Sequence, residues 1–588
     1  MNHGRCCPEH IYDRARVYQA LDYDDLAAFD AYTVHLLALK HLNPDEFVTD
    51  LQAYDVGGAP WQPSDEEAQG WFSKAMRILV PCLDRLGATR DAATMLAMWS
   101  KPPFNLANFD AALDHFPATY RNFVGENTPW SLSRSGHVPD TSIQPSRLDQ
   151  AVGSARREIY PWSTFEPDRN SRTALDEINA SLSTVAPKLE ARVTVLRDLV
   201  DPTKQWKQLG LFAREDLKPG EQVLREKSLI TAIRPLEDAI CDACGQDLEA
   251  VPAEERCECG GYDCDITFCS WECKDRASRE YHVPKLEEEE EEDYNDDDHE
   301  EPEGGEEEVE EEEENEGRGD KPDDDGGDAG SQDRSNDDIH PPAPFCSNQD
   351  NLNSIGRLQT TTTPEPDLYF LLLTRVTAMS ITQQTHPLLL PSIKYLWGDF
   401  TSTPSTTHSS SVPPIHTPAL PFSLTHTIAL PLEYFSTLSL THPSVTPYCS
   451  HWLQTFDSWI LQTLLAKFRG VANATQSSFD GKPEIAMVHP NWCLANHSCA
   501  PNVSWKPVGV RTFTVRTRDE SRSTDNLENG DIYESEADGG EEEGIRRDQE
   551  IFSHYTDISL DVVERRDRLR DVLGGECVCA RCERESKI

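Results

Sequence analysis

Cysteines at short spacings are the residues of this sequence best suited to do chemistry. The larger of two clusters supplies seven thiols and an imidazole: Cys241, Cys244, Cys257, Cys259, Cys264, Cys269, Cys273 and His282. That is the ligand count of two tetrahedral zinc ions, and zinc binding would supply the free energy that folds a segment with so few large apolar side chains. The alternative is a set of buried thiols without metal. Interleaved pairing assigns one ion to Cys241, Cys244, Cys269 and Cys273, and the other to Cys257, Cys259, Cys264 and His282.

Two shorter stretches near the end of the chain carry further candidate ligands. Cys577, Cys579 and Cys582 have metal-ligand spacing, but a tetrahedral zinc needs a fourth ligand from a distant part of the chain. The stretch Asn496-His497-Ser498-Cys499 places an amide, an imidazole, a hydroxyl and a thiol side by side. Taken alone, this stretch is typical of a polar turn around one buried cysteine.

The elements that must position these residues are predicted from apolar spacing. Helical spacing from Ile11 to about Trp99, and again from Thr173 to Leu199, predicts a mainly helical region over 1–200. β-type segments over 210–230, with a turn at Pro219-Gly220, predict a hairpin. Further helices are expected at 368–379 and 452–468, and strands at 503–505 and 511–517. The predicted fold class is therefore α+β.

The charge of the chain is large and uneven. Lys plus Arg total 54 against 104 Asp plus Glu among 588 residues, for a formal net charge of -50. Residues 287–328 hold 27 acidic residues and only two basic ones, so that tract alone contributes -25. A segment this acidic and this poor in apolar residues cannot build a core, so we expect 287–345 to be a disordered linker. The same charge argues against direct nucleic-acid binding and favours a basic partner.

No apolar run is long enough to span a membrane, and the N-terminal ten residues lack the apolar core of a signal peptide. We expect an intracellular protein without a membrane partner, in the nucleus or the cytoplasm. Cysteines stay reduced in those compartments, which favours metal over disulfides.

Four motifs, in order, resemble the SET-domain protein-lysine methyltransferases, in the branch that carries a MYND zinc finger inside the SET domain. GLFAREDLKPGEQVLREKSLI resembles the opening hairpin, NHSCAPNVSW the NHSC motif, SHYTD the catalytic tyrosine motif and CVCARC the post-SET zinc cluster. The form of the last two cysteine-containing motifs is more similar to fungal proteins of this branch. The resemblance implies a SET β-fold with a pseudoknot, an inserted MYND-like finger and a helical N-terminal region.

The resemblance also implies a role for each site residue. Asn496 and His497 would bind S-adenosylmethionine, as would the backbone of Gly210, Leu211 and Phe212. Tyr555 would be the catalytic residue at the cofactor, where it orients the substrate amine. Cys499 would be the missing fourth zinc ligand beside Cys577, Cys579 and Cys582. A lysine of a protein, such as a basic histone tail, would be the substrate, and the finger would take a proline-rich partner.

The motifs divide the chain into seven parts. These are a helical region (1–200), the first SET part (205–240), the finger (241–286), the acidic linker (287–345), a helical SET insertion with a Ser/Thr/Pro loop (364–480), the catalytic SET part (481–573) and the post-SET cluster (574–588). Two other functions stay open. One is a SET scaffold that binds partners without transferring methyl groups, and the other, disfavoured by the charge, is a zinc-dependent nucleic-acid binder.

Deletion of 287–345 tests the linker interpretation. We expect nearly unchanged thermal stability, because a tract that buries nothing adds little to a core, and slower association with a basic substrate at low salt. Circular dichroism melting measures the first expectation. Loss of the folded state on deletion would show that the tract is structural.

Overall fold

The computed structural model describes fifteen segments of the chain, and the acidic linker 287–345 lies outside them. The described residues are 8–42, 62–99, 153–156, 158–197, 205–233, 240–260, 264, 266–282, 368–398, 419–441, 455–476, 483–505, 509–517, 544–573 and 575–587. Within them the protein is a mixed α and β structure, as the sequence predicts. None of the described helices is both long enough and apolar enough to cross a membrane.

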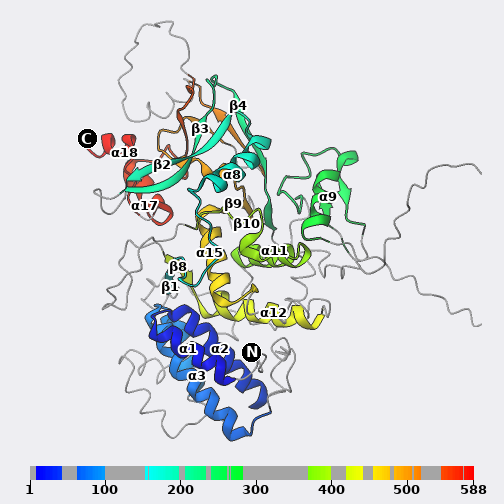
Figure 1. Ribbon diagram of the computed structural model, residues 1–588, viewed down its shortest axis with the longest axis vertical. Helices are drawn as coiled ribbons and strands as arrows, with labels where there is room; N and C mark the ends of the chain where they lie inside the picture. Colours follow the sequence, from blue (N-terminus) through cyan, green and yellow to red (C-terminus); the bar gives the residue numbers. More distant parts are fainter. Residues whose placement is uncertain are drawn as a thin grey trace, which may run out of the picture.

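Four N-terminal helices form a bundle at one end of the molecule (Figure 1). Their bounds are α1 Pro8–Ala20, α2 Asp24–Leu42, α3 Asp65–Arg85 and α4 Thr89–Trp99. Ser64 begins α3 with a capping box, because its hydroxyl accepts from the Glu67 N–H while the Glu67 carboxylate accepts from the Ser64 N–H. These helices confirm the helical structure predicted from Ile11 to Trp99, except over 43–61, which lies outside the described residues.

The helix predicted from Thr173 to Leu199 is confirmed only in its first half. Ser171 caps α8 (Arg172–Val185), but the chain then forms strand β2 (Leu189–Arg197). β2 contains the β-branched run Val193-Thr194-Val195, and it pairs along its whole length with β3 (Gln205–Ala213). Cross-strand pairing therefore overrides the helical spacing here, and the region before residue 200 contributes a strand to the central sheet.

The central sheet has the strand order β11-β14-β3-β2. β3 runs antiparallel to both of its neighbours, and the two-residue strand β11 (Asn496–His497) runs parallel to β14 (Glu550–Ser553). Three segments that are far apart in the sequence thus meet in one sheet. The NHSC and SHYTD stretches lie side by side because β11 and β14 pair.

The predicted hairpin over 210–230 is wrong in its pairing. β4 (Gln222–Lys227) pairs with β13 (Val510–Val515) instead of β3, and the turn at Gly220, with φ of 77°, leads the chain from one sheet into another. β13 also pairs with β12 (Val503–Ser504). The turn residues were visible in the sequence, but the partner strand lies about 290 residues away. A third sheet has the order β5-β10-β9, with bounds Ile230–Ile233, Pro483–Val488 and Asn473–Gln476.

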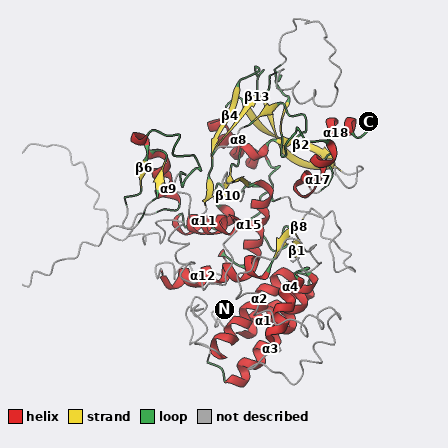
Figure 2. Ribbon diagram, turned by 180° about the vertical axis from the view of Figure 1, so that it is seen from behind, coloured by secondary structure: helices red, strands yellow, loops and turns green. Residues whose placement is uncertain are grey.

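A helical layer lies between the sheets and the N-terminal bundle, as both views show (Figures 1 and 2). It contains α11 (Leu368–Thr382), α12 (Leu430–Thr441) and α15 (Ser458–Val471). α11 and α15 agree with the two predicted helices, whereas α12 was not predicted. Arg14 of α1 contacts Asp457, the N-cap of α15, at 3.0 Å. Strands β1 (Gly153–Arg156) and β8 (Ala419–Phe422) pair across the same boundary. One continuous apolar core therefore joins the bundle to this layer.

The remaining described elements fall into two sets. The 3-10 helix η4 Pro387–Leu389 and the π-helix η5 Leu424–Ala429 belong to the helical layer. The other elements are the 3-10 helices η3 Ala253–Glu255 and η7 Trp492–Leu494, the strands β6 Cys257–Glu258 and β7 Thr267–Phe268, and the helices α9 Trp271–Glu280, α17 Val562–Leu573 and α18 Ala580–Glu585.

A buried ion pair fixes the segment 240–282, which we call the finger, against α11. Arg375 is 1% exposed, and its Nη2 lies 2.7 Å from Oδ1 of Asp242, between two of the cysteines. The guanidinium stacks on the ring of Tyr281 at 3.8 Å, and the Tyr281 hydroxyl donates to Asp242 Oδ2 at 2.9 Å. Each charged group is therefore satisfied inside the interface.

Replacement of Arg375 tests this docking. Arg375→Met should lower the free energy of unfolding by about 3–5 kcal/mol, because the Asp242 carboxylate is left buried without its cation. Urea unfolding followed by tryptophan fluorescence measures the loss. Arg279→Met is the matched control: its ion pair with Asp275 is exposed on α9, so we expect a change of less than about 1 kcal/mol. Equal losses in the two variants would contradict the docking role.

Candidate functional site

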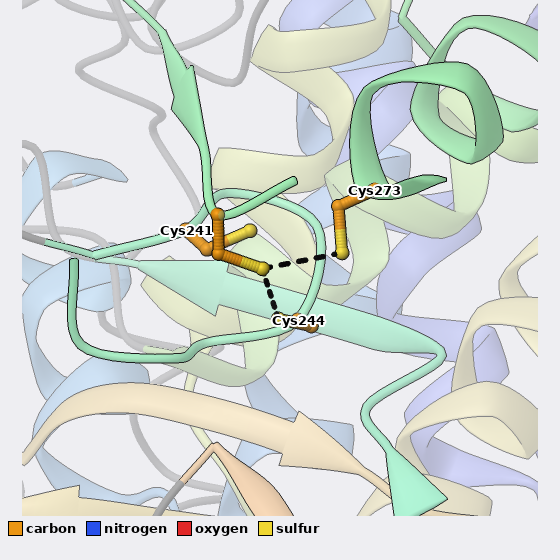
Figure 3. Close-up of side chains that lie close together, drawn as sticks. Cys241, Cys244 and Cys273 are labelled. Atoms are coloured by element: carbon orange, nitrogen blue, oxygen red, sulfur yellow. Dashed lines mark hydrogen bonds between the residues drawn. The ribbon is translucent and has the colours of Figure 1, made fainter. Parts of the chain in front are cut away.

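Four buried thiols of the finger converge as the sequence predicts. The sulfur atoms of Cys241, Cys244, Cys269 and Cys273 all lie within 4.8 Å of one another. Cys241 and Cys244 lie on a tight turn in which Gly245, with φ of 71°, donates its N–H to the Cys241 carbonyl. Cys273 projects from helix α9 toward that turn (Figure 3). Hydrogen bonds from neighbouring thiols, Cys241 first, lower the pKa of Cys269 to about 7. The tetrad has the ligand set of a closed, structural zinc site.

The second predicted site of the finger is only partly assembled. Cys259, Cys264 and His282 form a group, with His282 Nε2 2.9 Å from the Cys259 sulfur and 3.9 Å from the Cys264 sulfur. Cys257 is outside this group, and its thiol points to the Glu255 carbonyl at 3.6 Å. The structure therefore leaves Cys257, the predicted fourth ligand, outside the group. Cys257 lies within strand β6, which ends at Glu258, whereas Cys259 comes directly after the strand and is buried.

The C-terminal thiols meet a partner from a distant segment. Cys499 lies with Cys577, Cys579 and Cys582 in one group, and its sulfur is 3.4 Å from that of Cys582 and 3.9 Å from that of Cys577. Arg581, on the short helix between them, donates to the Cys499 carbonyl at 3.1 Å. This grouping has the distant fourth ligand that a tetrahedral zinc requires.

His497 connects that thiol group to the SHYTD stretch. The backbone N–H of Tyr555 donates to His497 Nδ1 at 3.1 Å, so the proton of the neutral ring lies on Nε2. Nε2 is 3.3 Å from the Cys499 sulfur and can donate to its thiolate. Burial lowers the pKa of His497 to about 4, which keeps the ring neutral. The imidazole is thus occupied on both sides, and only the backbone of His497 is left to contact a ligand.

Asn496 and Gly210 form a close backbone approach. The Asn496 amide donates to the Leu209 carbonyl at 3.2 Å and to Glu550 Oε1 at 2.7 Å. A Cβ on Gly210 would lie 2.5 Å from that carboxylate oxygen and 3.0 Å from the amide nitrogen. A side chain at position 210 would therefore displace the Glu550 carboxylate from this contact.

Leu211 and Phe212 follow Gly210 in the middle of the central sheet. Their backbones pair with β2 on one side and with β14 on the other. The Leu211 side chain lies in the core below the sheet, while Arg192 covers the ring of Phe212 at 5.3 Å. The structure thus places all three predicted strand residues beside Asn496 and β14, with Gly210 the closest.

Tyr555 lies against the backbone of the NHSC stretch. Its hydroxyl donates to the Ala495 carbonyl at 2.7 Å, and its ring centroid is 5.2 Å from that of His497. The residue is 38% exposed, yet its hydroxyl end is enclosed, and burial raises the pKa of Tyr555 well above its ordinary value. The hydroxyl is therefore neutral at physiological pH, and its oxygen keeps lone pairs that can accept a further hydrogen bond.

Two carboxylates near these residues were missed by the sequence interpretation. Glu550 is bonded to Asn496, and burial raises its pKa. Glu226 is almost fully buried, and burial raises its pKa to about 7 although it accepts from the N–H groups of Asn491 and Trp492 at 3.0 and 2.7 Å. Each is a single acidic residue in a strand, and no spacing in the sequence marks it.

Comparison with known proteins does not name the site. No protein-family model matches the chain, and no curated protein matches it.

Metal content tests the thiol groups. We expect each of the two four-thiol groups to hold one zinc ion, and Cys499→Ser to contain one zinc ion fewer than the wild type, because removal of one thiolate from a closed tetrahedral site abolishes strong binding there. Elemental analysis of purified protein measures both contents. Cys257→Ser is the matched control and should retain the wild-type content, since its thiol is outside the grouped ligands. A Cys499→Ser protein with full zinc content would show that the C-terminal site is wrong.

Proposed function

We propose that this protein is a protein-lysine methyltransferase that uses S-adenosylmethionine, with a SET-type fold and zinc in its cysteine groups. One arrangement carries the proposal: His497 joins the Tyr555 backbone to the Cys499 thiol, beside Asn496 and Gly210. The parallel pairing of β11 with β14 supports a SET-type crossing of the chain. The four resembling motifs, far apart in the sequence, meet around this pairing.

The residues at hand fit the proposed cofactor. Gly210 lets the Glu550 carboxylate and the Asn496 amide approach the strand backbone closely, which gathers these polar groups at one place. Asn496 offers an amide, and Glu550 offers a carboxylate whose pKa is raised by burial. When bound, S-adenosylmethionine supplies an electrophilic methyl group on a sulfonium.

The chain must bring a neutral lysine amine into line with that methyl group. The Tyr555 hydroxyl donates a hydrogen bond to the Ala495 carbonyl, so its oxygen is available as an acceptor for an amine N–H. This contact orients the nitrogen lone pair and needs no strong base. Because the pKa of Tyr555 is raised, the hydroxyl does not ionise as the amine approaches.

The substrate and partners follow from charge and exposure. A net charge of -50 favours a basic protein segment, such as a histone tail, as the source of the lysine. On the finger, Trp271 is 67% exposed on α9 with Lys274 above its ring, and an exposed indole suits a proline-rich partner. Zinc has a structural role in this proposal, since it joins Cys499 to the C-terminal thiols beside the reaction site.

One contact favours a second candidate function, a scaffold that binds partners without transferring methyl groups. The Asn496 amide nitrogen already donates to both Leu209 and Glu550, so its donor capacity for a cofactor is taken up. A scaffold would bind no S-adenosylmethionine, and calorimetric titration with the cofactor separates the two functions.

Tyr555→Phe tests the catalytic assignment. We expect turnover to fall by roughly a hundredfold or more with cofactor affinity retained, because the lost hydroxyl acts on the amine in the transition state. Initial rates with labelled cofactor, on a substrate first labelled in a lysate, measure the turnover. Calorimetry measures the affinity.

Tyr434→Phe is the matched control. The Tyr434 hydroxyl is buried on α12 without a hydrogen-bond partner among the described residues, so its removal should leave turnover unchanged. Wild-type methyl transfer by Tyr555→Phe would remove the residue from the mechanism. A wild-type protein that binds no S-adenosylmethionine would leave the scaffold function.

A further inference from the structure

Glu226 is a buried carboxylate whose hydrogen bonds all go to one turn of the chain. It lies in β4 and is 2% exposed. Its Oε1 accepts from the backbone N–H of Asn491 at 3.0 Å and from the Asn491 side-chain amide at 2.9 Å, and its Oε2 accepts from the Trp492 N–H at 2.7 Å. Among the described residues no cation forms an ion pair with it, and burial raises its pKa despite the three N–H donors. A carboxylate buried in this way is costly to the folded state, so stability alone does not account for it.

Glu226 has the role of a helix cap for the turn η7. Asn491 holds the N-cap position of this turn, but its own side chain makes no capping hydrogen bond. The Asn491 side-chain amide instead donates to Glu226 and, at 3.2 Å, to the Ser181 hydroxyl of α8. The N–H groups at the start of a helical turn ordinarily bond to a side chain of the same segment. Here the acceptor comes from a strand 265 residues earlier, so Glu226 fixes where the turn lies relative to the sheet β12-β13-β4.

The turn η7 leads directly to the backbone that holds the Tyr555 hydroxyl. Trp492 donates its N–H to Glu226, and its carbonyl accepts from the Ala495 N–H at 3.3 Å. The Ala495 carbonyl in turn accepts from the Tyr555 hydroxyl at 2.7 Å. Asn496 follows at once and begins β11. A continuous run of hydrogen bonds therefore connects the Glu226 carboxylate to the Tyr555 hydroxyl through two residues of one short segment.

We propose that Glu226 is a positioning residue of the methyl-transfer site, which fixes, through the turn η7, the Ala495 carbonyl that orients the Tyr555 hydroxyl. The inference rests on the proposed function, in which the Tyr555 oxygen accepts from the substrate amine. A hydroxyl that follows a displaced carbonyl turns its lone pairs away from the amine, and an in-line displacement is sensitive to small errors of alignment. Glu226 acts through other residues in this role and does not contact the reacting atoms.

A double-mutant cycle of Glu226→Gln with Tyr555→Phe tests this role. Glutamine keeps the shape of the side chain, but its NH2 group would face one of the N–H groups that the carboxylate now accepts. We expect turnover to fall by about 10-fold or more in Glu226→Gln, because the Tyr555 hydroxyl loses its alignment. In the Tyr555→Phe background, which has no hydroxyl to orient, the same change should alter turnover by less than about 2-fold. Single-turnover rates with labelled cofactor measure all four proteins.

Two further variants complete the test. Glu221→Gln is the matched control, because Glu221 immediately precedes β4 and its carboxylate bonds to Lys188 and to the Lys218 N–H instead of η7, so turnover should stay within about 2-fold of wild type. Asn491→Ala removes one donor and leaves both backbone contacts to Glu226, so it tests the same turn where Glu226→Gln does not fold. We expect Asn491→Ala to lower turnover by about 3- to 10-fold, and this loss too should disappear in the Tyr555→Phe background.

Amide hydrogen exchange reports on the turn η7 independently of methyl transfer. In Glu226→Gln the amides of 491–495 should exchange about 10-fold faster than in the wild type, since the turn loses its acceptor, while those of β2 and β3 stay unchanged. Unchanged exchange at 491–495, or an equal loss of turnover in both backgrounds, overturns the inference and leaves the proposed function intact. A wild-type protein that transfers no methyl group to any protein of the lysate defeats the proposed function, and the role of Glu226 with it, whatever the exchange rates.

Discussion

The convergence of Cys499 with the three C-terminal thiols is the constraint on which the candidate site depends. Four sulfur atoms within 4.8 Å of one another hold the last described helix, α18, against the NHSC stretch. The grouping also fixes His497, whose Nε2 lies against the Cys499 sulfur while Nδ1 accepts from Tyr555. A metal bound there would therefore set the position of the Tyr555 backbone through one imidazole. Such a metal would lie close to the proposed reaction site and orient it through this histidine.

A second close contact between distant segments lies where strand β3 meets β11 and β14. Gly210, Asn496 and Glu550 come from three separate segments, and the missing side chain at 210 leaves room for the amide and the carboxylate to meet over the strand. The finger is attached more strictly, because a Cβ on Gly509 would collide with the backbone at Gly245. The cysteine turn of the finger and the sheets are thus coupled through backbone contacts.

The N-terminal region contributes charge as well as packing. Its bundle meets the helical layer through the pair between Arg14 and Asp457, and its last loop brings Glu166 to the buried Lys467. Arg169, on the same loop, is the charge that this network leaves uncompensated. A region without recognisable chemistry in its sequence therefore supplies charges to the interior of the helical layer. An unpaired buried charge is costly to the folded state.

The sequence by itself determined the ligand groups and most helices. The spacing of the thiols assigned Cys241 and its three partners to one metal site and the remaining finger ligands to another. The two cysteines of a Cys-x-x-Cys or Cys-x-x-x-Cys pair lie on one turn, so both can bind the same ion. Resemblance to known motifs supplied the partnership of Cys499 with the C-terminal thiols. Tertiary structure alone decided three matters: the strand at 189–197, the separation of β3 from β4, and the exclusion of Cys257. Each depends on contacts with distant backbone, which local propensity does not encode. Tertiary structure also decided which charged residues are partly or fully buried, namely Glu550, Glu226 and Arg169. The sequence does not mark a single charged residue as unusual, because its environment changes only when folding removes its water.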